Sequence, residues 1–212
     1  MTRKIPNLLG VLLLFPFLSF AQTIIHERLL SFENPEVPSF ISTTKSYLSI
    51  SQEHYKDGNQ SLAWQFESDG ELTINKLLGF EKKDPTGVDT YYSTFIVWVY
   101  NENPIDDTIQ FEFLKDGKKC TSFPFRINFS GWRAAWVCYE RDMEGTPEEG
   151  MNQIRIIAPP TNGQLYFDHL LTSAKTAHIP LTPAVPFPFV NKNTNSHWLV
   201  LLRPSLLQPD IP

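Results

Sequence analysis

The sequence is short of three features: long apolar helical repeats, an excess of positive charge, and cysteine, of which there are two in 212 residues. Because helical repeats are missing and the 17 prolines would interrupt helices, an all-β domain is the favoured class. A net charge of −5 argues against nucleic acid or acidic lipid as an obligatory partner, because neither would meet a basic field. Any anionic polymer would have to be met by local cations.

Catalytic motifs are missing as well. The sequence shows no catalytic triad, no paired carboxylates and no metal-hydrolase motif, which argues against an autonomous enzyme. The histidines are scattered among termini, turns and strand ends without a shared motif, so we predict none of them as a catalytic base: His26, His54, His169, His178 and His197.

The two cysteines, Cys120 and Cys138, both lie in strand-like stretches. A disulfide between them would stabilise an exported chain by about 3 kcal/mol in the chain-entropy model. Buried free cysteines are also common as small core residues. The sequence leaves both alternatives open.

The N-terminus has the pattern of a signal peptide. Arg3 and Lys4 precede an apolar run over residues 8–20, and Ser19-Phe20-Ala21 ends it with small residues at the positions that a signal peptidase reads. We predict a signal peptide over 1–21, cleaved after Ala21, and a bacterial protein that is secreted or periplasmic. The run is shorter than the ~20 residues that span a bilayer, so we expect no membrane attachment after cleavage. No cysteine follows the site, which argues against a lipid anchor.

The stretch 95–113 sets the fold prediction. Residues 95–100 are six β-branched or aromatic residues without a charge, which predicts a strand buried on both faces. The strand must end before Pro104, which has no N–H to give to a neighbouring strand. Residues 108–113 then alternate between polar and apolar, which predicts a strand with one face on a core and the other in water.

Further strands are expected at similar spacing: 24–32, 47–51, 61–66, 71–74, 121–127, 131–139, 152–157 and 163–168. Many short strands without a long helix predict an all-β jelly-roll sandwich over residues 22–175. The remaining residues, 176–212, are rich in proline and are predicted to form an irregular linker and the stub of a following domain.

Five stretches, in their order and spacing, resemble the N-terminal domain of bacterial chondroitin sulfate ABC lyases, over roughly residues 24–173. They are Gly58-Asn59-Gln60-Ser61-Leu62-Ala63-Trp64, Trp98-Val99-Tyr100-Asn101-Glu102-Asn103-Pro104-Ile105-Asp106, Phe129-Ser130-Gly131-Trp132-Arg133, Ile154-Arg155 and Tyr166-Phe167-Asp168.

The resemblance implies a galactose-binding-like jelly roll, similar to carbohydrate-binding modules, ahead of an α/α-toroid domain that performs β-elimination. The implied function is non-catalytic: the domain would help to present a glycosaminoglycan such as chondroitin or dermatan sulfate to a toroid that this chain lacks. The chain alone is then expected to be inactive. The alternative is a purely structural domain that packs on the catalytic domain and binds no sugar.

Candidate sugar contacts are aromatic rings and arginines. Sugar rings pack their C–H faces on aromatic rings, and arginine binds carboxylate or sulfate with two hydrogen bonds. Core packing is the expected role of the aromatics within strands, which are Trp64, Trp98, Tyr100, Trp132 and Trp136. The predicted carbohydrate contacts are therefore Tyr55, Tyr91 and Tyr92 at loop edges, with Arg126, Arg133 and Arg155; each arginine would otherwise be a solvated cation.

A structural Ca²⁺ is also predicted. Jelly-roll carbohydrate modules often hold one between an acidic residue after the first strand, loop oxygens before a Gly-x-x-Ser-Leu strand and a late aspartate. Glu33, Asp57, Asn59 and Asp168 occupy comparable places, and their hard oxygens suit Ca²⁺. Asp57 and Asn59 are otherwise ordinary turn residues.

Overall fold

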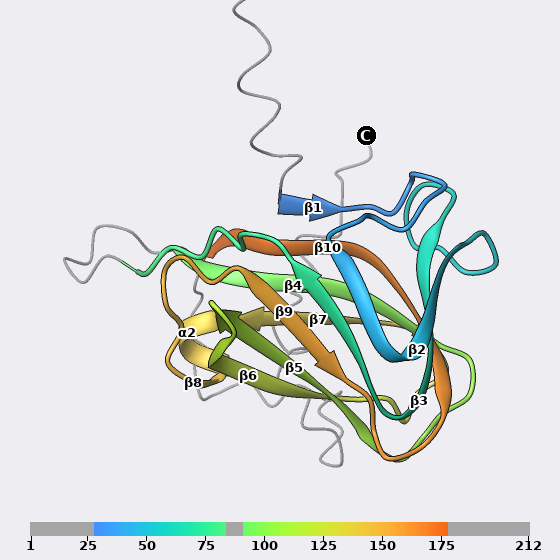
Figure 1. The fold of residues 1–212 in the computed structure, drawn as a ribbon. Helices are drawn as coiled ribbons and strands as arrows, with labels where there is room; N and C mark the ends of the chain where they lie inside the picture. Colours follow the sequence, from blue (N-terminus) through green and yellow to red (C-terminus); the bar gives the residue numbers. More distant parts are fainter. Residues whose placement is uncertain (1–27, 84–90, 178–212) are drawn as a thin grey trace, which may run out of the picture.

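The computed structural model describes residues 28–83 and 91–177, which form ten strands and a four-residue helix (Figure 1). Every strand pairing is antiparallel. The elements are β1 (Leu29–Leu30), β2 (Ile41–Ser51), β3 (Ser61–Asn75), β4 (Tyr91–Asn101), β5 (Thr108–Lys115), β6 (Lys118–Arg126), β7 (Gly131–Cys138), α2 (Tyr139–Asp142), β8 (Glu144–Gly145), β9 (Gln153–Ile157) and β10 (Gly163–Ala177).

The strands form one sheet that curls into two layers. Its order is β7-β4-β10-β3-β9-β5-β6-β8, with β2 on β3 and β1 on β10. Strand β3 belongs to both layers, because residues 62–66 pair with β10 and residues 71–75 pair with β9. Figure 1 shows β10 and β4 along one side of the molecule and β5 and β6 along the other. The predicted all-β jelly-roll sandwich is confirmed.

The crossing between layers lies in the gap between the two predicted strands 61–66 and 71–74. Instead β3 runs on through Asp69, at φ +56°, and Gly70. The facing residue of β2, Lys45, also has a positive φ, and the register shifts there. A Cβ on Gly70 would lie 2.8 Å from the backbone carbonyl oxygen of Lys45, so the two strands bend together only with glycine at this point.

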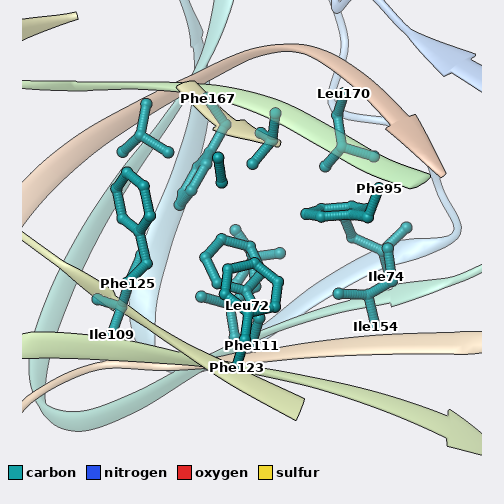
Figure 2. Close-up of a cluster of buried hydrophobic side chains, with 14 of the residues drawn as sticks. Leu72, Ile74, Phe95, Ile109, Phe111, Phe123, Phe125, Ile154, Phe167 and Leu170 are labelled. Carbon is teal, nitrogen blue, oxygen red and sulfur yellow. The ribbon is translucent and has the colours of Figure 1, made fainter. Parts of the chain in front are cut away.

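The space between the layers is filled by phenylalanines and aliphatic residues (Figure 2). Phe111 of β5 stacks on Phe123 of β6 with ring centroids 4.8 Å apart, and Phe95 of β4 meets them from the opposite layer. Each fully buried ring of this kind stabilises the fold by roughly 1.5–3 kcal/mol. Trp64 is fully buried too, as predicted.

The prediction that residues 95–100 are buried on both faces is wrong for one face. Phe95, Val97 and Val99 are fully buried in the core, whereas Ile96, Trp98 and Tyr100 remain partly exposed. No other layer of the described chain covers that second side completely. An uncharged aromatic run therefore forms part of the surface.

Several sequence predictions fall at the margins of the described residues. The predicted signal peptide, 1–21, lies outside them, as does the tail from residue 178 onward. Strand β10 continues to Ala177, paired with Tyr91. Cys120 and Cys138 are both free thiols. No helix in the described part of the chain is long and apolar enough to cross a membrane.

Candidate binding surface

A partly exposed aromatic face lies on the outer side of β4 and β7. We define it as Ile96, Trp98 and Tyr100 of β4 with Trp132 and Trp136 of β7. The two strands are neighbours in register, with Tyr100 opposite Trp132 and Ile96 opposite Trp136. Because side chains alternate across a strand, the residues between them point into the core. The register therefore brings five large apolar side chains together on one surface.

The two tryptophans of β7 are both partly exposed. They are four residues apart on the same side of one strand, which separates them by about 13 Å. Ala134, between them and opposite Trp98, is small. Trp132 also meets Tyr100 at a centroid distance of 5.4 Å, with the ring planes tilted by 60°.

The loop over residues 52–60, between β2 and β3, folds onto the aromatic face. The His54 ring stacks on Tyr100 at 3.9 Å with an interplanar angle of 19°, and it meets Tyr166 of β10 edge-on at 4.8 Å. The Lys56 ammonium lies 4.2 Å from the centroid of Trp98. One side of the Tyr100 ring is thus covered, whereas Trp132 and Trp136 lie on the neighbouring strand and are partly exposed.

Tyr166 joins the loop to the sheet. Its hydroxyl donates a hydrogen bond to Glu53 Oε2 at 2.8 Å and accepts one from Gln164 at 2.7 Å. Burial, with the hydrogen bond to the Glu53 carboxylate, raises the pKa of Tyr166 to about 12. This hydroxyl therefore stays protonated at neutral pH and acts as a donor.

Two carboxylates fix the backbone of the 52–60 loop. Asp168 of β10, which is fully buried, accepts hydrogen bonds from the amides of Lys56 at 2.6 Å and Asp57 at 2.9 Å. Burial raises the pKa of Asp168, and the amide hydrogen bonds oppose that rise. Glu33 accepts hydrogen bonds from the amides of Asn59 and Gln60.

The predicted calcium ligands are therefore brought to one loop, but not into a coordination sphere. The Glu33 and Asp168 carboxylates face amide N–H groups, and Asp57 accepts from the amide of Gly58. In residues 28–83 and 91–177, no group of three or more His, Cys, Asp or Glu side chains is placed to hold a metal. Calcium binding would require these carboxylates to turn from the amides to the ion, and it stays a prediction.

The predicted tyrosine contacts lie apart from one another. Tyr55 is 45% exposed within the 52–60 loop. Tyr91, 50% exposed, and Tyr92 begin β4, and the Tyr92 hydroxyl accepts a hydrogen bond from Lys83 Nζ at 2.9 Å. Tyr55 is thus the one predicted aromatic contact on the loop that borders the aromatic face.

The predicted arginine contacts are divided among three strands. Arg126 of β6 lies 3.5 Å from the Asp106 carboxylate. Arg133 of β7 lies over the Phe129 ring at 4.3 Å, and burial lowers its pKa. Arg155 of β9 donates to the Glu112 carboxylate at 2.9 Å, on the opposite layer from the aromatic face. The six predicted contacts do not converge, and their binding role stays a prediction.

Sequence reasoning missed the aromatic face because every strand tryptophan was expected in the core. The available signal was the alternation in β7. Trp132, Ala134 and Trp136 lie on one side, while Ala135 and Val137 lie on the other and are fully buried. Read together with the β4 register, this period of two places the tryptophans on one surface.

Residues 26–189 match the family model described as "Lyase, N terminal". The chain belongs to this family. It is 60% identical over 191 residues to a chondroitin sulfate ABC exolyase of Bacteroides thetaiotaomicron, covering 90% of this chain and 19% of that protein. It is 33% identical over 172 residues to the chondroitin sulfate ABC exolyase of Proteus vulgaris, covering 79% of this chain and 17% of that protein. The expected family is confirmed, and the chain spans about a fifth of these relatives.

Solved structures are similar in fold. An exo-β-agarase matches with a TM-score of 0.52 at 10% identity, over 72% of this chain and 25% of that chain. At this level of identity the similarity concerns the β-sandwich fold alone.

Proposed function

We propose that this chain is the non-catalytic, polysaccharide-binding domain of a chondroitin-type lyase, and that it helps to present a glycosaminoglycan to a catalytic domain elsewhere in the protein. The observation that carries this proposal is the aromatic face, where two tryptophans of β7 are partly exposed beside Trp98 and Tyr100 of β4. The family and the names of the relatives supply the substrate class.

The aromatic face suits a polymer better than a single sugar. Each stack of a sugar ring on an indole contributes on the order of 1 kcal/mol, by analogy with aromatic pairs. Two indoles about 13 Å apart contact different residues of one extended chain. Two weak contacts on one polymer add their free energies, since the second forms without a new loss of translational freedom.

We assign the elimination chemistry to the remainder of the protein. That reaction needs a base for the C5 proton, an acid for the leaving oxygen and a group that neutralises the uronate carboxylate. The two histidines that the structure describes serve other roles, because His54 stacks on Tyr100 and His169 Nδ1 lies 3.6 Å from the Asp57 carboxylate. A substrate that is an extracellular polymer also fits the proposed export of the chain by its N-terminal signal.

Affinity electrophoresis tests the proposed function. The purified chain is run in gels that contain chondroitin sulfate, hyaluronan or no polymer, beside its Trp132→Ala and Trp136→Ala variants. Each variant is expected to bind about fivefold more weakly, which corresponds to one lost stack. Leu77→Ala removes an apolar side chain that is 65% exposed away from the aromatic face, and it should bind as the unmodified chain does.

Two outcomes would overturn the proposal. If the folded chain is retarded by neither polymer, the chain is a structural domain, and its aromatic face covers another part of the lyase. If the chain binds but both tryptophan variants bind equally well, the polysaccharide lies on a different surface. Circular dichroism of each variant establishes that it is folded.

A further inference from the structure

We propose that Lys56 and Trp98 together form the subsite that recognises an acidic group of the bound polysaccharide, with a carboxylate or sulfate on the Lys56 ammonium and sugar rings on the neighbouring tryptophans. This inference rests on the proposed function and adds the residue that selects for charge. It begins from the position of the Lys56 ammonium, 4.2 Å from the centroid of the Trp98 ring.

Lys56 is held in place by its own backbone. Its amide donates to the buried Asp168 carboxylate at 2.6 Å, and the next amide, of Asp57, donates to the same oxygen at 2.9 Å. The Ser61 hydroxyl donates to the carbonyl of His54, two residues earlier. The backbone that carries the lysine side chain is therefore fixed relative to the sheet, so binding an anion does not require the loop to become ordered.

Among residues 28–83 and 91–177, no ion pair joins Lys56 to a carboxylate, and its ammonium contacts the Trp98 ring. Several cations elsewhere are paired with carboxylates: Arg155 and Lys119 share Glu112, Lys115 lies 3.5 Å from Glu148, and Arg126 lies 3.5 Å from Asp106. The contact with Trp98 attracts the ammonium to the ring without cancelling its charge. Its three N–H groups thus remain available to an anion.

The neighbours of Lys56 match the structure of an acidic sugar. Trp98, over which the ammonium lies, is opposite Ala134, the residue midway between the two tryptophans of β7. A uronic acid or sulfated sugar has an apolar C–H face and an anionic group at the edge of its ring. The face can stack on an indole while the anion meets Lys56. One cation at this position predicts one recognised anion, and not a densely charged segment.

The test compares two polymers that differ only in charge. Binding of chondroitin sulfate, and of chondroitin that has been desulfated and carboxyl-reduced, is measured for the purified chain and for Lys56→Gln at several salt concentrations. Lys56→Gln should weaken binding of chondroitin sulfate about fivefold and flatten its salt dependence, because a surface ion pair has been lost. Binding of the neutral polymer should be unchanged.

Lys76→Gln is the matched control, because the Lys76 ammonium also lies over a ring, 5.6 Å from the centroid of Phe40, away from the aromatic face. It should alter neither affinity nor salt dependence. The inference is wrong if Lys56→Gln, with an unchanged melting temperature, binds chondroitin sulfate as tightly as the unmodified chain. That result would leave the proposed function intact, whereas failure of the unmodified chain to bind either polymer would remove both.

Discussion

Glu112 of β5 is an almost fully buried carboxylate that forms ion pairs with two cations of its own layer. Its side chain is 9% exposed, Arg155 donates to it at 2.9 Å, and the Lys119 ammonium lies 3.3 Å away. Burial acts to raise the pKa of Glu112, but the hydrogen bonds from Arg155 and Lys119 outweigh it and the pKa is lowered. Arg155 is therefore engaged by Glu112 within its own layer.

A substitution at Glu112 tests this pairing. Glu112→Gln should lower the free energy of unfolding at pH 7 by about 1–3 kcal/mol, since charged hydrogen bonds are lost. A lowered pKa in the folded state means stability that is present above the unfolded pKa and lost as pH falls through the folded pKa. The difference between the two proteins should therefore shrink below about pH 4.5, the unperturbed value.

Urea denaturation across pH measures this difference. Arg126→Gln is the control, because its partner Asp106 is 84% exposed and such surface pairs contribute at most about 1 kcal/mol. A Glu112→Gln difference that stays constant from pH 7 to pH 3 would contradict the pairing.

At the level of single residues, the sequence showed which tryptophans lie in strands but not which of them are buried. Trp64 was correctly expected in the core, but the same expectation for Trp132 and Trp136 was wrong on the exposed side of β7. Both kinds of tryptophan occur in similar apolar strands, and the difference is whether a second layer lies over them. The Arg155–Glu112 pair joins residues 43 positions apart, so only the sheet register shows that the arginine is engaged.

Among the elements, the 52–60 loop depends on two carboxylates that are distant in sequence, and Gly58 tests that dependence. Gly58 has φ +68°, and an added Cβ would lie 2.2 Å from Glu33 Oε1. Gly58→Ala should lower the melting temperature, because the Glu33 carboxylate must leave the amides that it binds. It should also weaken chondroitin binding, because Lys56 lies in the same loop.

Gly117→Ala separates the loss of the carboxylate contact from backbone strain. Gly117 has a similar φ of +78°, but nothing lies within 4 Å of its added Cβ. We expect a cost of about 1 kcal/mol from strain alone, and no effect on binding. Equal melting temperatures for the two variants would show that Glu33 does not hold the loop.

The predicted calcium ion belongs to the same element. If Ca²⁺ binds at Glu33 and Asp168, removal by EDTA should lower the melting temperature, and added Ca²⁺ should restore it, because an ion bound only to the folded state stabilises it. Glu33→Gln should abolish this response. A melting temperature that does not change with EDTA would exclude the ion, with the amides as the sole partners of the carboxylates.

Most strands were predictable from composition and alternation, but not how far they continue. The gap between the predicted strands 61–66 and 71–74 is a real change of direction, yet β2 pairs with β3 on both sides of it, because β2 bends at the facing position. Helix α2 escaped prediction because four residues carry no helical period. The length of β3 and the position of α2 both depend on contacts between residues distant in sequence, which a local sequence pattern does not show.

As a whole, the sandwich has two outer faces of different chemistry. The β4–β7 side presents tryptophans with Lys56 over the Trp98 ring, whereas the β5–β9 side presents the ion pair of Arg155 and Glu112. The overall net charge of −5 means that a polyanion is not attracted by a general field. Binding at the β4–β7 face therefore depends on stacking on tryptophan rings and on the local charge of Lys56.

The family and the all-β fold were both evident from the sequence, since they rest on patterns spread along the chain. The candidate surface was not, because it depends on which strands become neighbours: β4 and β7 are separated in sequence by β5 and β6, yet adjacent in the sheet.

Isothermal titration calorimetry of the purified chain with chondroitin sulfate and with hyaluronan, at low and moderate salt, tests the central claim most directly. We predict saturable binding that weakens as salt rises but persists at moderate salt, because the tryptophan stacks are not screened while the Lys56 contact is. Absence of binding to both polymers at low salt, in a sample whose circular dichroism shows a folded β-sandwich, would contradict the account and leave the domain a scaffold for the rest of the lyase.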